Sequence, residues 1–194
     1  MIALTSLCVY CGSSIGVDPA HRAAAGRLGG LMAERGVRLV FGGGRTGLMG
    51  VLADAVLAAG GSVVGVIPDH IEEREVGHGG VSELLIVDSM HERKHRMFEL
   101  ADGFAVLPGG LGTLDETLEI ITWRQLGLHD KPIVLVDSAG YWAPLEGLLE
   151  HVIAGGFARP DTRRLYTVVA TVDDIFDALA AAPPPAAPAR DALI

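Results

Sequence analysis

The chain has 194 residues, of which 49% are hydrophobic and 20% charged, values typical of one globular α/β domain with a real core. Its net charge is −9 and it has no basic run, which argues against nucleic acid as a partner. It shows no secretory signal and no apolar segment long enough to cross a bilayer, so we expect a cytoplasmic protein with no membrane partner.

Strand-like and helix-like segments alternate along the whole chain. The first helix begins at Pro19 after the N-cap Asp18 and ends at Gly36, a residue type suited to a helix C-terminus. We expect a loop at 69–82 that reaches over a site, one domain at 1–181 and a disordered Pro/Ala-rich tail at 182–194. The strands are predicted at 6–11, 37–41, 62–67 (broken by Pro68), 84–87, 103–107, 133–136 and 168–170, and the later helices at 47–59, 90–101, from 113, 142–154 and 172–181.

The predicted strands are continuous apolar runs rather than alternating ones. This pattern indicates strands that are buried on both faces, and therefore an α/β fold with a doubly wound parallel sheet of about seven strands between two helical layers. In such sheets ligands bind outside the C-terminal ends of the strands, where the glycine-rich turns at Gly12, Gly42 and Gly109 are expected.

The segment Pro108–Thr113 connects a buried strand to a helix through Gly109, Gly110 and Gly112. A turn with almost no side chains leaves backbone N–H groups open at the positive end of the helix dipole. The sequence therefore predicts a phosphate site at this loop.

A second glycine loop offers an alternative ligand. Gly42, Gly44 and Gly47 fit G-x-G-x-x-G, and Asp69 follows at about the distance of a ribose-binding acid. The turn follows the second strand rather than the first, so a tight turn with close helix packing is the stronger interpretation. The pair Cys8 and Cys11 is interpreted as two buried or strand-end residues, because a redox C-x-x-C belongs at a helix start.

The helix from Met90 carries two cations beside its apolar stripe, Arg93 and Lys94. A buried cation needs an anion, and a ligand phosphate and Glu116 are both candidates. The alternative is that both side chains pack along their stems and keep their charges in water. Ser89 and Glu92 form a capping box, so Glu92 is expected to be structural.

Glu116 also has two interpretations. It can close a capping box with Thr113, or it can face a cleft. The predicted helix is apolar on two sides, one formed by Leu114 and Leu118 and the other beside Glu116, so one side needs a cover other than the sheet. We therefore expect a homodimer.

At this point the sequence resembles the Lonely guy (LOG) family, often labelled "lysine decarboxylase-like". The segment Pro108–Glu116 matches the signature P-G-G-x-G-T-x-x-E, and Cys11–Ser14, Gly42–Gly50 and Met90-x-x-Arg93-Lys94 match in the same order. The resemblance extends to about residue 180. Leu111 replaces an aromatic residue that is common in the family and Asp115 a common Glu, which leaves the base preference open.

The resemblance implies a Rossmann-like homodimer that hydrolyses the N-glycosidic bond of cytokinin riboside 5′-monophosphates, and often of AMP, to free base and ribose 5-phosphate. It implies that Arg93 and Glu116 are the catalytic pair. The substrate-binding residues that it implies, together with those expected from the glycine turns, are Gly12, Ser13, Gly43, Gly44, Glu75, Arg93, Lys94, Gly109, Gly110, Leu111, Gly112, Thr113, Leu114, Asp115 and Thr122.

This chemistry suits the residues. Cleavage of an N-glycosidic bond builds an oxocarbenium-like centre, which the Glu116 carboxylate can stabilise while it orients or deprotonates water. Arg93 can neutralise charge on the phosphate or the leaving base. No metal or cofactor is needed, and the alternative is a module of the same fold that binds a nucleotide or a phosphorylated cofactor without turnover. Decarboxylation with pyridoxal phosphate is disfavoured, because the only lysines are Lys94 and Lys131.

Overall fold

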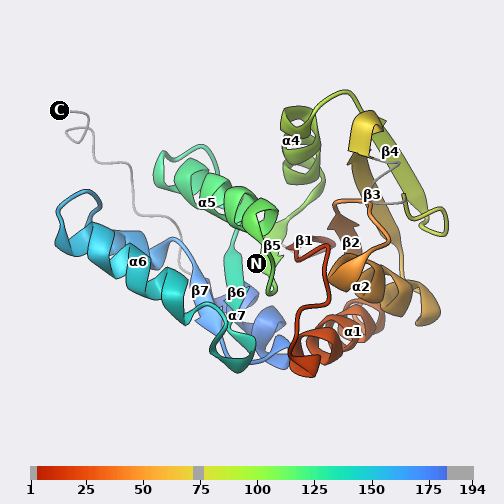
Figure 1. Ribbon diagram of the computed structural model, residues 1–194, viewed down its shortest axis with the longest axis horizontal. Coiled ribbons are helices and arrows are strands. Elements are labelled where there is room, and N and C mark those ends of the chain that lie inside the picture. Colours follow the sequence, from red (N-terminus) through yellow and green to blue (C-terminus); the bar gives the residue numbers. More distant parts are fainter. Residues whose placement is uncertain (1–3, 72–76, 183–194) are drawn as a thin grey trace.

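The computed structural model describes residues 4–71 and 77–182, and its centre is one sheet of seven parallel strands (Figure 1). The strand order is β4-β3-β2-β1-β5-β6-β7. The fold is therefore the doubly wound, Rossmann-like α/β fold that the sequence predicts. The strands are β1 (Ser6–Tyr10), β2 (Arg38–Phe41), β3 (Val63–Pro68), β4 (Glu83–Val87), β5 (Gly103–Val106), β6 (Ile133–Val136) and β7 (Thr167–Val169).

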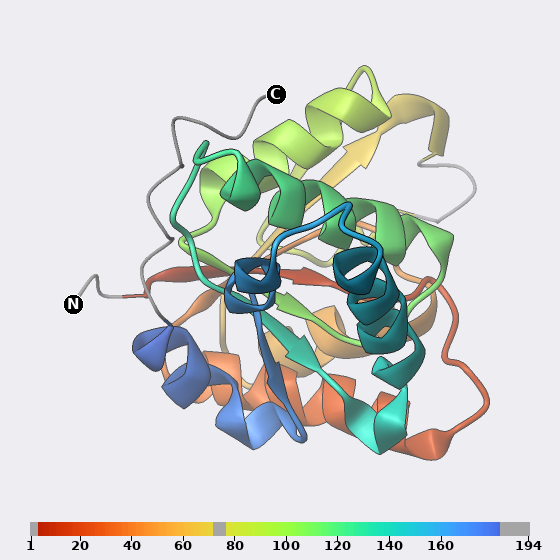
Figure 2. The same cartoon turned by 90° about the vertical axis from the view of Figure 1, so that its left-hand side faces the viewer.

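Helices cover both faces of the sheet, as Figure 2 shows with α4 and α5 above it and α1 and α7 below. Each face has its own apolar core: Leu28 and Leu52 belong to the one on the α1 and α2 side, and Met97 and Ile120 to the one on the α4 and α5 side. Burial on both faces explains why the strands are apolar throughout. The helices are α1 (Pro19–Glu34), α2 (Gly47–Ala58), α4 (Met90–Leu100), α5 (Leu111–Gln125), α6 (Ala143–Ala154) and α7 (Ile175–Ala181), with short 3₁₀ turns at Ser138–Gly140, Pro160–Arg164 and Val172–Asp174.

The strand order reverses at β1, which pairs with β2 on one side and with β5 on the other. A doubly wound sheet opens a crevice at this point, outside the carboxyl ends of the two strands that diverge. The loops that follow β1 and β5 contain Gly12 and Gly109, so the topology places the predicted phosphate loop at this crevice.

Several predicted boundaries are shifted by one to three residues, and three differences change how a segment is built. Pro68 does not break the third strand but is its last residue, where it pairs with Val87 of β4. The other neighbour, β2, already ends opposite Gly65, so the missing N–H of Pro68 breaks no hydrogen bond to β2. The helix predicted from residue 113 starts at Leu111. The last helix is divided into a 3₁₀ turn and α7.

Within the described residues, no helix is both long and apolar enough to cross a membrane. Of the predicted tail, only Ala182 belongs to the described part of the chain.

Candidate active site

The N-terminus of α5 is open, with Gly110 as its N-cap and no side chain capping it. The first intrahelical bond of this turn joins the Leu114 N–H to the Gly110 carbonyl at 3.0 Å. The preceding N–H groups, from Leu111 to Thr113, lie at the positive end of a helix of 15 residues. This is the arrangement that binds a phosphate through the main chain.

The loops after β1 and β5 lie directly against each other. The Gly12 N–H donates to the Pro108 carbonyl at 3.0 Å. A Cβ on Gly109 would lie 2.1 Å from Thr113 Oγ1 and 2.8 Å from the Gly12 nitrogen, so no larger residue fits at 109. The predicted residues Gly12, Gly109 and Thr113 therefore form one compact wall of the crevice.

Arg93 reaches this crevice from α4 and is buried, with 5% of its surface exposed. Its Nη2 donates to the Gly42 carbonyl at 2.8 Å, and its Nη1 contacts Met90 Sδ at 3.6 Å. A Cβ on Gly42 would lie 1.9 Å from Nη2, so the guanidinium occupies the space that a side chain at 42 would fill. The second glycine loop thus seats Arg93, which disfavours the dinucleotide alternative there.

Glu116 is buried on α5, 9% exposed, in the second turn of the helix. Because α5 begins at Leu111, Thr113 already lies inside the helix, and the capping-box interpretation of Glu116 is wrong. Burial raises the pKa of the Cys8 thiol; the negative charge of Glu116 adds to this and the positive charge of Arg93 opposes it. The Glu116 and Arg93 charges therefore both act on Cys8 of β1.

Lys94 joins α4 to α5 through two carboxylates. Its Nζ lies 3.0 Å from Asp115 Oδ2 and 3.1 Å from Glu119 Oε1. Burial lowers the pKa of Lys94, but the hydrogen bonds to Asp115 and Glu119 outweigh it, so the pKa is raised and the ammonium stays charged. Lys94 and Asp115 neutralise each other beside the crevice, and their roles as substrate ligands stay predictions.

The other predicted substrate residues differ in position. Gly43 and Gly44 are buried, whereas Ser13, Gly110, Leu111 and Gly112 are exposed and Leu114 is half-buried. Thr122 is exposed, and its hydroxyl donates to the Leu118 carbonyl at 2.7 Å. It lies 11 residues beyond Leu111, about 16 Å along the helix axis, so α5 does not bring it to the loop of its own chain. Glu75 lies outside the described residues.

The sequence did not reveal two features of this site. One is that Gly42 makes room for the Arg93 guanidinium, and the other is Tyr141. The Tyr141 hydroxyl donates to the Gly109 carbonyl at 2.6 Å, from the turn before α6. Its ring also packs edge-on against His21 of α1, with centroids 5.4 Å apart. No motif marks Tyr141, because its role depends on the contact between segments 32 residues apart.

Three further reactive side chains, those of Cys8, Cys11 and Lys131, have structural surroundings. Cys8 and Cys11 are free thiols, and the structure confirms the prediction that they are buried at β1 or its end. Burial is the largest cause of the raised pKa of each thiol, which disfavours the reactive thiolate of a redox motif. Lys131 donates to the Phe98 carbonyl at 2.6 Å, at the C-terminus of α4. In the described part of the chain, no cluster of three His, Cys, Asp or Glu side chains could hold a metal ion.

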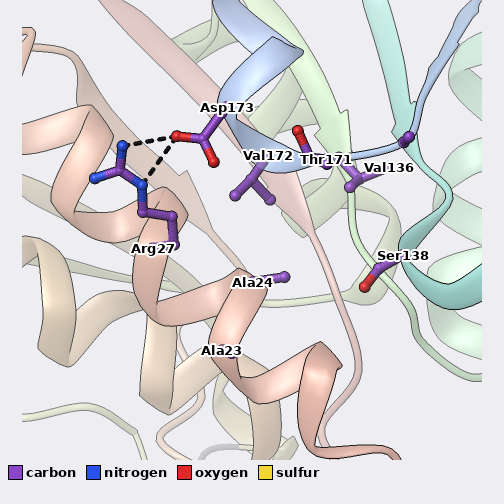
Figure 3. Close-up of a pocket in the computed structure, with 9 residues that line it drawn as sticks. Ala23, Ala24, Arg27, Val136, Ser138, Thr171, Val172 and Asp173 are labelled. Atoms are coloured by element: carbon purple, nitrogen blue, oxygen red, sulfur yellow. Dashed lines mark hydrogen bonds and ion pairs between the residues drawn. The ribbon is translucent and has the colours of Figure 1, made fainter.

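A second hollow, of about 250 Å³, lies between α1 and the ends of β6 and β7 (Figure 3). Its cation, Arg27, already pairs with Asp173, at 3.0 Å from Nε and 2.7 Å from Nη2. Much of the remaining lining consists of small apolar side chains such as Ala23, Ala24 and Val172. This hollow is therefore less suited to a phosphate than the crevice at α5.

Comparison with known proteins decides the family. The chain is 45% identical over 177 residues to the cytokinin riboside 5′-monophosphate phosphoribohydrolase of Rhodococcoides fascians, covering 91% of this chain and 88% of that protein. It is 44% identical over 169 residues to the Oryza sativa enzyme LOG, covering 87% and 70%. The chain belongs to the LOG family. A family model described as "Possible lysine decarboxylase" also matches residues 49–179 of this LOG protein.

Solved structures agree with the fold of this LOG protein. The molybdenum cofactor carrier protein of Chlamydomonas reinhardtii superposes with a TM-score of 0.69 over 90% of this chain and 95% of that one. The two sequences are 21% identical, so the likeness extends to the fold alone. The site of this LOG protein must therefore be argued from its own residues.

Proposed function

We propose that this LOG protein is a phosphoribohydrolase, which cleaves the N-glycosidic bond of cytokinin riboside 5′-monophosphates and of AMP to give free base and ribose 5-phosphate. The observation that carries the proposal is the open N-terminus of α5 with a buried carboxylate, Glu116, in the second turn of the same helix, together with a buried guanidinium, Arg93, fixed at the end of β2 by its bond to the Gly42 carbonyl. Relatives of 44–45% identity bear the names of such enzymes.

In this proposal the main-chain N–H groups from Leu111 to Thr113 bind the 5′-phosphate. The phosphate does not react, so its binding energy serves to fix the ribose relative to the catalytic groups. A substrate without the phosphate should then lose rate as well as affinity.

Glu116 stabilises the positive charge that develops on the sugar as the bond from C1′ to the base nitrogen breaks. It also accepts a proton from the attacking water, whose oxygen forms the new bond to C1′, and the base leaves with the electron pair of the broken bond. Since Glu116 is buried, its carboxylate acts at low local dielectric, where charge interactions are strong.

Arg93 supplies the positive charge of the site. Its bond to the Gly42 carbonyl fixes the guanidinium, which can neutralise the phosphate or the departing base and orient Glu116. The chemistry needs no metal or cofactor.

The proposal includes a homodimer. Large apolar side chains are exposed on and just after α5 and α6, with Leu111 at 85% and Phe157 at 90%, a pattern that favours a protein partner. The other exposed apolar side chains of these segments are Leu118, Leu126, Leu128 and Leu148. Thr122 lies one turn after Leu118, on the same face of α5. The proposed location is the cytoplasm, in keeping with two cysteines that are both free thiols.

The test is incubation of the purified protein with AMP, isopentenyladenosine monophosphate and their unphosphorylated nucleosides, followed by chromatographic detection of free base. We expect base from the monophosphates and much less from the nucleosides. Binding of the monophosphates without release of base would contradict the proposal and favour the non-catalytic nucleotide-binding module.

A further inference from the structure

Asp54 and His78 form a partly buried contact outside the proposed catalytic pair. His78 is 3% exposed, and its Nε2 lies 2.9 Å from Oδ1 of Asp54 on α2. The Gly80 N–H donates to Nδ1 of the same ring at 3.3 Å. Because Nδ1 accepts a hydrogen bond, the neutral ring carries its proton on Nε2 and donates it to Asp54.

The backbone beside His78 holds the glycine loop that follows β2. The His78 N–H donates to the Gly43 carbonyl at 2.9 Å, and Gly77 forms an isolated antiparallel bridge with Gly44. The preceding carbonyl, that of Gly42, accepts the 2.8 Å bond from Arg93. The loop is thus held between His78 on one side and Arg93 on the other.

Three consecutive glycines have no side chains with which to fix the direction of their carbonyls, and glycine has the greatest backbone freedom of any residue. The direction of the Gly42 carbonyl therefore depends on the bonds made by its neighbours. The ring of His78 is anchored on α2, a helix of 12 residues with a buried face, so α2 supplies the rigid support.

We propose that His78 and Asp54 are positioning residues for Arg93. Asp54 holds the ring of His78, the backbone of His78 holds Gly43, and the fixed glycine loop aims the Gly42 carbonyl at the guanidinium. The catalytic consequence rests on the proposed hydrolase function; the structural consequence, a fixed Arg93 side chain, does not.

The test compares two pairs of variants. Asp54→Ala removes the acceptor and Asp54→Asn keeps an amide oxygen in its place; His78→Ala removes the ring and His78→Gln keeps an N–H donor at similar reach. We expect kcat to fall about 10- to 100-fold in the alanine variants, because small misplacements of a catalytic group cost factors of this size. KM should change less than about threefold, and the Asn and Gln variants should recover most of the rate.

The second readout does not depend on turnover. In protein labelled with ¹⁵N-arginine, the Nε–H signal of Arg93 is assigned by its loss in Arg93→Lys. We expect this proton to exchange with water faster in the alanine variants than in the wild type, Asp54→Asn or His78→Gln. If the wild type releases no base from any nucleotide, the hydrolase proposal fails while this comparison still decides the positioning role.

Asp173→Ala is the matched control, since it removes a carboxylate, 55% exposed, from an ion pair far along the chain from the site. It should leave kcat and Arg93 exchange unchanged. If His78→Ala does not fold, Asp54→Ala alone tests the positioning proposal, because the Asp54 side chain is 60% exposed and its removal leaves no cavity. Alanine variants with unchanged kcat and unchanged Arg93 exchange, whatever their melting temperature, overturn the proposal.

Discussion

The guanidinium of Arg93 lies where a side chain at residue 42 would have to be, with Nη2 bonded to the Gly42 carbonyl at 2.8 Å. The turn at the end of β2 and a helix residue 51 positions later in the sequence thus define a single position for one positive charge. The first prediction follows from this contact.

Gly42→Ala should displace Arg93 and lower kcat/KM by at least about tenfold, since its Cβ would lie 1.9 Å from Nη2. The crowding should also cost about 1–3 kcal/mol of unfolding free energy. Arg93→Ala should likewise lose affinity and rate. Steady-state assays of base release and urea unfolding measure the two effects. Gly30→Ala on α1, where an added Cβ meets nothing within 4 Å, is the control and should keep full activity.

Glu116→Gln should reduce kcat by about 10²- to 10⁴-fold, the usual contribution of a general base, with a melting temperature close to that of the wild type. The amide has nearly the same shape but neither accepts the proton nor balances the positive charge. Chromatography of released base and thermal unfolding provide the comparison. Glu99→Gln, on the exposed face of α4, should retain its rate. A normal rate in Glu116→Gln would remove the carboxylate from the mechanism.

Tyr141→Phe should loosen the phosphate loop, because the lost hydroxyl donates to the Gly109 carbonyl at 2.6 Å. A hydrogen bond of this kind contributes about 0.5–1.5 kcal/mol net, so the dissociation constant for ribose 5-phosphate should rise by about 2- to 13-fold. Isothermal titration calorimetry measures it. Equal affinities in the two proteins would mean that the loop holds its shape without Tyr141.

Leu118→Glu should convert the proposed dimer into a monomer, because it places a charge on the apolar surface of α5, where Leu118 is 38% exposed. Light scattering after gel filtration measures the mass. Val17→Glu, at an exposed apolar residue of the loop after β1, serves as the control. A monomeric wild type would refute the dimer directly.

Asp102 predicts an acid-dependent loss of stability. Its Oδ2 accepts four hydrogen bonds of 2.8–3.1 Å from the backbone and side chains of Thr5 and Ser6. Burial raises the pKa of Asp102 but these bonds lower it, and the net shift is downward. A carboxyl whose folded pKa is depressed stabilises the fold above its unfolded pKa, and that stabilisation is lost as pH falls through the folded value.

Asp102→Asn should therefore be less stable than the wild type at pH 7, by about 1 kcal/mol. The difference should shrink as pH falls below about 4. Urea unfolding at pH 7, 5, 4 and 3 measures it. A difference that stays constant across this range would mean that the charge of Asp102 contributes nothing.

The sequence alone determined the fold class, the approximate strands and the open glycine turn before α5, because these depend on local patterns. Apolar runs predict buried strands, and glycines between a strand and a helix predict an open helix N-terminus. The structure confirms the Ser89 half of the predicted capping box with a 3.1 Å bond from the Glu92 N–H to Ser89 Oγ, while the Glu92 carboxylate accepts from the Asp88 N–H at 3.0 Å. Resemblance to the LOG family added the proposed catalytic pair, Arg93 and Glu116.

Only the tertiary structure excluded the capping-box interpretation of Glu116, because that interpretation depends on where α5 begins, and the helix starts two residues before its predicted place. The partners of the two cations could not be predicted from the sequence either. Lys94 pairs with carboxylates on α5. Arg93 bonds to the backbone carbonyl of Gly42, and because every residue has a backbone carbonyl, no residue type indicates this partner. Strand order brings the loops of Gly12, Gly42 and Gly109 to one edge of the sheet, where Arg93 bonds to Gly42. Local sequence patterns do not predict the order of the strands in the sheet, because that order depends on how the apolar faces of the whole chain are buried together.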